Sequence, residues 1–219
     1  MKKIVSILAI FTFVLILAGC TNPLNRAGKI VQNTNDKINA TTKKKADVNL
    51  NEDYFFMIKG KKFKAGDKIN NIASVGLKQD SRVVDQKVSK NTYLIGGGNI
   101  YNSDDKRVIS ITPFNSSSEE ILAKDAEIGG FEAGEYEYSV IPQEVLDLNI
   151  SIVGGIKFGS TYDELVSVFG ETTNTFHSES LGYTTYTYKS DKVYRSFEFT
   201  VDKNNKVSRI RWQNLEYNR

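Results

Sequence analysis

The clearest pattern of apolar and polar positions lies near the C-terminal end of the chain. Its apolar members recur every three or four residues, the period of one helix face; they are Tyr162, Leu165, Val166 and Phe169. Thr161 and Glu164 have the spacing of an N-terminal capping box, and Gly170 is a natural C-terminal stop. The pattern predicts a short helix over 162–169 that must dock its apolar stripe to be stable.

After this segment the pattern changes to alternation. Apolar residues at every second position over 193–201, interrupted once by Arg195, predict a strand with one buried face. Residues 183–189 predict an earlier strand, and 207–213 a later one that follows a polar turn. The first residue of that last strand is out of phase with the others, which indicates a β-bulge near Ser208. We therefore expect one helix packed on an antiparallel meander.

The first half of the chain carries a fainter version of this pattern. Residues 66–76 can be aligned with 159–170 through their glycines and apolar positions, and the polar turn at 104–108 corresponds to 203–207. The two pairs of segments occur in the same order along the chain and are separated by similar numbers of residues, which favours a duplicated unit. The alternative is chance, because helix caps and hairpin turns resemble each other in many proteins.

These patterns together predict an α+β fold. It consists of two tandem helix-on-antiparallel-meander units, over 52–142 and 143–219, with a boundary near Pro142. Residues 20–51 are rich in Asn, Thr and Lys and poor in large apolar side chains, so they predict a flexible tether.

The N-terminal residues show a third pattern. Lys2 and Lys3 precede an uncharged, mostly apolar run over 4–17, which is shorter than the roughly 20 residues of a spanning helix. A cleaved secretory signal over 1–19 is the favoured interpretation, and an uncleaved membrane helix is the alternative. The tetrapeptide Leu17-Ala18-Gly19-Cys20 resembles a bacterial lipobox. The resemblance implies cleavage between Gly19 and Cys20, fatty acyl chains such as palmitate on Cys20, and a place on the extracytoplasmic face of the cell membrane.

Charge and cysteine content narrow the classes of function. Without Lys2 and Lys3, 27 basic residues balance 26 acidic ones, so the chain has no basic excess for binding nucleic acid. Cys20 is the only cysteine, which excludes an internal disulfide. The Lys-, Asn- and Ile-rich composition weakly favours an AT-rich, Gram-positive source.

One further resemblance concerns the folded part. The stretch from Gly155 to Leu165, continued by Phe169-Gly170-Glu171, is similar to the helix start of the small lipoproteins related to the outer-membrane assembly lipoprotein BamE. The two predicted units also resemble beta-lactamase inhibitory protein. Both resemblances imply a protein-binding role, and neither transfers a functional residue to this chain.

The sequence offers no set of residues for catalysis or metal binding. His177 is the single histidine, and we expect it in an exposed loop, without the partners of a catalytic triad or a zinc site. Gly96-Gly97-Gly98 lacks the spacing of a phosphate-binding loop. The acidic pairs are more typical of turns and helix starts than of catalysis; they are Asp104-Asp105, Glu119-Glu120 and Asp163-Glu164. We therefore predict no catalytic residue, metal or cofactor.

Aromatic residues are the most suggestive candidates for function. Tyrosine, tryptophan and arginine dominate binding hot spots, and they crowd the last meander. The alternative is that most of these rings pack against the helix or against the other unit. The candidate binding surface consists of Tyr183, Tyr186, Tyr188, Tyr194, Arg209, Arg211 and Trp212.

The leading hypothesis is a non-enzymatic, lipid-anchored binding module that recognises another envelope or secreted protein through its sheet faces. A lipoprotein that binds cell-wall glycan or a small ligand through the same aromatics is the alternative. An envelope hydrolase with an unrecognised site is the third possibility.

Overall fold

The computed structural model describes residues 48–95 and 98–215. These residues belong to one compact unit with its own hydrophobic core. The predicted signal over 1–19, the lipidation site Cys20 and nearly all of the tether lie outside the described residues. Among those described, no helix has the length and apolar character needed to cross a membrane.

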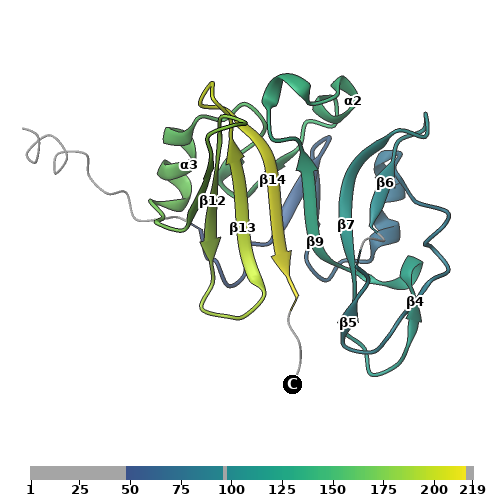
Figure 1. The fold of residues 1–219 in the computed structure, drawn as a ribbon. Coiled ribbons are helices and arrows are strands. Elements are labelled where there is room, and N and C mark those ends of the chain that lie inside the picture. The colour runs from purple at the N-terminus through teal and green to yellow at the C-terminus, as the bar shows by residue number, and fades with distance from the viewer. Residues whose placement is uncertain (1–47, 96–97, 216–219) are drawn as a thin grey trace, which may run out of the picture. The chain divides into compact units, whose positions relative to one another are not determined.

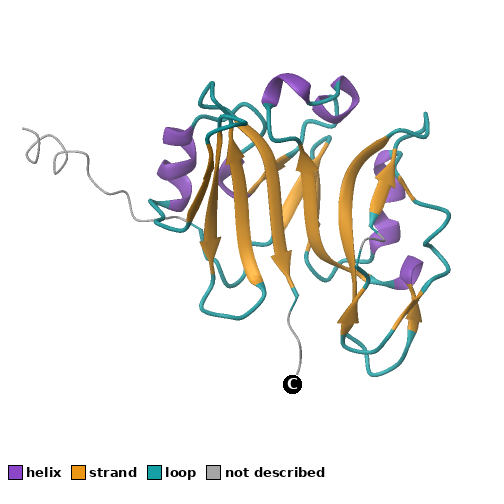
Figure 2. Ribbon diagram, in the orientation of Figure 1, coloured by secondary structure: helices purple, strands orange, loops and turns teal. Residues whose placement is uncertain are grey.

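A nine-stranded antiparallel sheet forms the larger layer of the fold (Figures 1 and 2). A short strand, β5 (Thr92–Tyr93), pairs with one edge of β7. The other strands, in spatial order, are β11 (Thr175–Ser178), β12 (Tyr183–Lys189), β13 (Arg195–Val201), β14 (Val207–Asn214), β9 (Glu127–Gly134), β7 (Arg107–Asn115), β6 (Asn99–Tyr101) and β3 (Lys78–Gln79).

Smaller elements complete the fold. A three-stranded sheet has the order β10 (Ser151–Ile152), β1 (Phe55–Ile58) and β2 (Lys61–Lys64), and β4 (Lys87–Val88) pairs with β8 (Ile121–Leu122). Within the described residues, the α-helices are α2 (Gln143–Leu146) and α3 (Tyr162–Phe169). The 3-10 helices are η1 (Ile69–Val75), η2 (Ala123–Asp125), η3 (Tyr138–Val140) and η4 (Val153–Gly155).

The core lies on one face of the large sheet. Phe169 of α3 contacts Phe199 of β13, with 4.9 Å between ring centroids. Phe56 of the small sheet stacks on Phe131 of β9, with centroids 4.2 Å apart. Figure 1 shows the early strands, in blue, behind the large sheet and α3 beside β12. Helix and small sheet therefore cover the same face of the large sheet, here called the inner face.

The prediction of two tandem helix-on-meander units is wrong. Over the described residues the fold is mostly β, with 41% strand against 17% helix, and its largest element is one continuous sheet. Strand β9, which precedes the expected boundary at Pro142, pairs with β14 at the end of the chain. The two halves merge because Phe131 on β9 and Trp212 on β14 bury their side chains in the same core.

The expected first helix also differs from the prediction. The segment is the 3-10 helix η1, whose preceding residue Lys68 gives no side-chain cap. Its sequence contains Ile69, Asn70, Asn71 and Val75, residue types with low helix propensity. Ile69 and Ile72 of this segment are buried, as Leu165 and Phe169 of α3 are, so the capping box and the helix propensity distinguish the two segments.

The predicted second helix is confirmed, together with its capping box. The Thr161 hydroxyl accepts the Glu164 N–H at 3.2 Å, and the Glu164 carboxylate accepts the Thr161 N–H at 2.7 Å. The strand over 183–189 is confirmed as β12. The bulge is confirmed at Ser208, because Thr200 pairs with Arg209 and the next residue on β13 pairs with Val207.

Candidate functional site

The face of the large sheet opposite the core, here called the open face, carries a group of charged side chains. Alternation along β14 places Ile210 and Trp212 in the core, so Arg209 and Arg211 project from the other side. The same rule places Glu132 of β9 and Glu198 of β13 on the open face, one on each side of β14. Three neighbouring strands therefore bring two cations between two anions.

These four residues form a lattice of ion pairs, here called the charge lattice. Arg209 Nη2 lies 2.8 Å from Glu132 Oε1, and its Nε donates to the same oxygen at 3.0 Å. Arg211 lies 3.7 Å from Glu132 and 3.5 Å from Glu198. The side chain of Glu132 is 42% exposed and that of Arg211 is 32% exposed. The lattice is therefore held in place yet accessible from solvent.

An aromatic stack borders the charge lattice. Tyr136, in the loop after β9, stacks on Tyr183 of β12 with ring centroids 4.8 Å apart. The Arg209 guanidinium lies 5.2 Å from the Tyr136 ring centroid, which is within range of a cation–π interaction. Phe176 of β11 lies 6.3 Å from Tyr183 and is 61% exposed. Charged and aromatic contact groups thus form one continuous part of the open face.

Three of the sequence-predicted residues lie in this site. Tyr183 belongs to the aromatic stack, and Arg209 and Arg211 belong to the charge lattice. Tyr194, in the hairpin between β12 and β13, is 51% exposed but lies outside both groups.

The other three predicted residues lie on the inner face, where Trp212 and Tyr188 are buried and Tyr186 is partly buried. Trp212 is fully buried. The Tyr188 hydroxyl donates to the Gly170 carbonyl at 3.1 Å, and Tyr186 stacks on Tyr162 of α3. The two tyrosine rings pack between the large sheet and the helix, because alternation places Tyr186 and Tyr188 on the side of β12 that α3 covers.

Sequence reasoning missed four members of the site. Glu198 had a usable signal, since it alternates with buried phenylalanines on β13. Phe176 and Tyr136 lie beside the predicted meander without a periodic pattern of their own. Glu132 has no local signal, because its role depends on the pairing of β9 with β14.

The open face offers no deep cavity among the described residues that line it. The hollow beside the lattice, lined by Ser110, Thr112 and Arg211 among others, measures about 220 Å³. Small-molecule sites usually measure roughly 300–1,000 Å³ and are mostly apolar. The shape of this face suits a broad contact better than an enclosed ligand.

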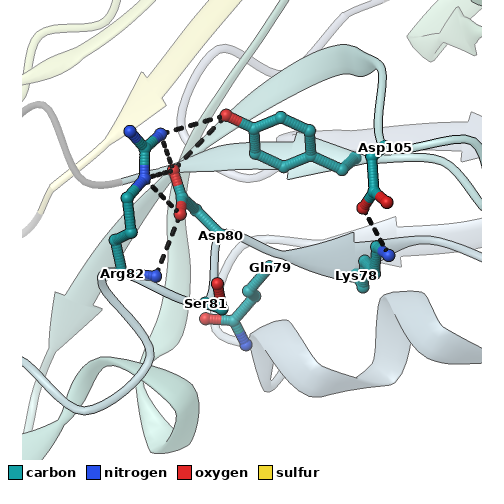
Figure 3. Close-up of a pocket in the computed structure, with 7 residues that line it drawn as sticks. Lys78, Gln79, Asp80, Ser81, Arg82 and Asp105 are labelled. Atoms are coloured by element: carbon teal, nitrogen blue, oxygen red, sulfur yellow. Dashed lines mark hydrogen bonds and ion pairs between the residues drawn. The ribbon is translucent and has the colours of Figure 1, made fainter.

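A second hollow of about 310 Å³ lies at the other end of the sheet, beside β3 and β6 (Figure 3). Asp80 and Arg82 point toward each other there, with Arg82 Nη2 2.6 Å from Asp80 Oδ2, and the Tyr101 hydroxyl lies 3.3 Å from that oxygen. Hydrogen bonds from Arg82 hold the pKa of Asp80 at about 2. Lys78 pairs with Asp105 at 2.6 Å. The charged groups are neutralised by one another, so the hollow presents no poised acid, base or nucleophile.

The remaining sequence candidates have structural partners. His177 is exposed on β11, not in a loop, and its Nδ1 lies 2.9 Å from Thr184 Oγ1. Glu164 caps α3, and Glu120 pairs with Lys87 at 2.7 Å. Within 48–95 and 98–215, no group of three His, Cys, Asp or Glu residues is placed to hold a metal ion.

Comparison with known proteins adds no relative to this description. The chain matches no protein-family model, no curated protein and no solved structure.

Proposed function

We propose that this chain is a lipid-anchored extracytoplasmic binding module that recognises another envelope or secreted protein through its open face. The lipobox-like tetrapeptide ending in Cys20 is the basis for the anchor. The observation that carries the binding role is the charge lattice and the aromatic stack side by side on a sheet face whose opposite side holds the core.

The composition of this surface favours a protein partner. Tyr, Phe and Arg are enriched where protein interfaces gain most of their affinity. Tyr136 and Phe176 supply exposed aromatic area, while Arg211 and Glu132 supply both signs of charge in a fixed pattern. A partner with the complementary charge pattern would be recognised in one register, because like charges placed opposite each other cost affinity.

The proposal is tested by measuring which envelope proteins bind to an immobilised fragment of residues 44–219, which contains the compact unit described above. Three baits are compared: wild type, an open-face variant, and a control. The open-face variant is Phe176→Ala with Arg211→Ala. The control, Ile95→Ala with Lys90→Ala, also removes one exposed apolar side chain and one cation, but outside the site.

We expect one envelope protein to bind wild type and control equally and to bind the open-face variant at least about tenfold more weakly. Equal capture by all three baits would contradict the use of this face. Protein capture at background level, combined with a saturable thermal shift by peptidoglycan fragments, would favour the glycan-binding alternative.

A further inference from the structure

A cluster of lysines on the hairpin between β1 and β2 has no role in the site described above. The hairpin turns through Lys59 and Gly60, which both have positive φ angles of 49° and 80°. This is the conformation of a tight two-residue turn that matches strand twist. The four exposed lysines, here called the lysine hairpin, are Lys59, Lys61, Lys62 and Lys64.

These lysines differ from most other cations of the fold in their pairing. Within the described part of the chain, none of the four forms an ion pair. By contrast, six lysines elsewhere are paired with carboxylates; they are Lys68, Lys78, Lys87, Lys106, Lys124 and Lys203. The nearest acid in sequence, Asp67, accepts the backbone N–H of Lys64 at 2.9 Å. A chain with balanced overall charge thus concentrates unpaired positive charge on one hairpin.

The lysines share their surface with apolar side chains. The register pairs Phe55 with Lys64 and Met57 with Lys62, so these two apolar residues and these two lysines project from one face of the small sheet. Lys61, which pairs with the buried Ile58, lies on the other face, and its ammonium donates to the Ser74 hydroxyl. Phe55 and Met57 are only partly buried, and Lys62 Nζ lies 3.8 Å from the Phe55 ring centroid. A basic surface with half-exposed apolar groups is suited to the boundary between headgroups and acyl chains of a membrane.

The position of the hairpin relative to the open face is defined by the core. Phe56 and Phe63, which alternate with the exposed residues, point inward, and Phe56 stacks on Phe131 of the large sheet. The lysine-bearing face therefore points away from the large sheet, on the side of the molecule opposite the charge lattice.

We propose that the lysine hairpin is a docking surface for a membrane that contains anionic phospholipid. The choice of a membrane as occupant rests on the lipid anchor proposed above, which would hold the domain close to a bilayer, and on charge complementarity. Each lysine near an anionic bilayer raises the binding constant by about fivefold. Docking through this surface directs the open face away from the bilayer, where it is accessible to a partner.

A competing explanation is that the lysines only protect an edge strand. Strand β2 is at the edge of the small sheet, and lysines on such strands discourage pairing with other chains. That role needs no lipid, so a measurement of lipid binding separates the two explanations.

The test measures vesicle binding by the fragment of residues 44–219, which carries no lipid and therefore binds only through its own surface. Flotation at low ionic strength compares phosphatidylcholine vesicles with vesicles that also contain phosphatidylglycerol. The hairpin variant is Lys59→Gln, Lys62→Gln and Lys64→Gln. The control is Lys90→Gln, Lys189→Gln and Lys206→Gln, which removes the same charge elsewhere. Thermal unfolding checks that both variants keep the fold.

We expect wild type and control to bind the anionic vesicles, and the hairpin variant to bind about 10- to 100-fold more weakly. The binding should decrease as salt is added, because exposed charges are screened. Hydrogen exchange should show protection of the hairpin when anionic vesicles are present.

Three results would overturn the docking surface: no binding to anionic vesicles, equal binding by the hairpin variant and the control, or equal binding to neutral vesicles. Binding to a soluble glycerol-phosphate polymer without binding to vesicles would assign the surface to a wall polymer instead. Because the open-face variant Phe176→Ala with Arg211→Ala should bind vesicles like wild type, failure of this inference is distinguishable from failure of the proposed function.

Discussion

Trp212 on β14 and Phe131 on β9 are directly paired on neighbouring strands of the large sheet, with ring centroids 6.3 Å apart. Tyr54 contacts Trp212 edge-on at 5.8 Å, and Phe56 stacks on Phe131. Three distant parts of the sequence therefore meet at one aromatic cluster. This cluster connects the two sheets and explains why the chain folds as one unit.

Truncation of Trp212 should be among the most destabilising changes in the protein. Trp212→Ala leaves a cavity at the centre of the core and should lower the free energy of unfolding by about 3–5 kcal/mol. Trp212→Phe should cost much less, because the indole Nε1 has no hydrogen-bond partner within the described residues. Urea unfolding of both variants measures the difference.

Val193→Ala is the control for this comparison, since Val193 is 73% exposed and should change stability by less than about 0.5 kcal/mol. If Trp212→Ala and Val193→Ala unfolded at the same urea concentration, the central position of Trp212 would be refuted.

Two buried tyrosines should make the fold sensitive to alkali. Burial raises the pKa of Tyr54 and of Tyr188 above the usual value of 10.0, and the positive charge of Arg195 acts in the opposite direction on Tyr54. A raised pKa in the folded state means that the unfolded state releases the proton first. The stabilising contribution is therefore complete below about pH 10 and decreases as the pH rises above that value.

Urea midpoints measured between about pH 8 and 11 test this dependence, with a slope of up to about 1.4 kcal/mol per pH unit for each tyrosine. Tyr54→Phe and Tyr188→Phe together should flatten the slope, even though each loses one hydrogen bond. An unchanged alkaline slope in the double variant would show that other groups cause the loss.

The two arginines of the charge lattice should contribute unequally to stability. Arg209 is only 12% exposed, donates twice to Glu132 and contacts the Tyr136 ring, so Arg209→Ala should cost about 1.5–3 kcal/mol. Arg211 is more exposed and makes longer contacts, so Arg211→Ala should cost less than about 1 kcal/mol. Denaturant unfolding of both variants, each repeated with Glu132→Gln, isolates the coupling. Equal costs would contradict this ranking.

Local signals were sufficient for several elements in the second half of the fold. The capping box at Thr161, the strand over 183–189 and the bulge at Ser208 all depend on residues close in sequence, and each was predicted correctly. The turn at 202–206 has a counterpart at 102–106, where Asp105 has the same φ of 59° as Asn205. Such turns depend on Asn and Asp, which tolerate positive φ.

The alternation of apolar and polar residues does not predict which strands pair when they are far apart in the sequence. Alternation places residues on two faces of a strand but does not say which other strand lies beside it. The pairing of β9 with β14 created the single sheet and brought Glu132 to Arg209, and neither follows from local periodicity. For the same reason Trp212 was included in a binding surface although it is part of the core.

Gly134 at the end of β9 gives the sharpest test of this strand pairing. Its φ is +89°, and a Cβ atom there would lie too close to the Ser208 carbonyl oxygen and the Phe158 ring. Gly60 has a similar φ of +80° but no atom within 4 Å of the same position. Gly60→Ala therefore measures the backbone cost alone, about 1–2 kcal/mol. Gly134→Ala should cost several kcal/mol more, because backbone must move to relieve the clash. Chemical unfolding measures both values, and loss of soluble protein for Gly134→Ala alone would agree in direction. Equal costs would mean that β9 does not approach the bulge at Ser208 as closely as described.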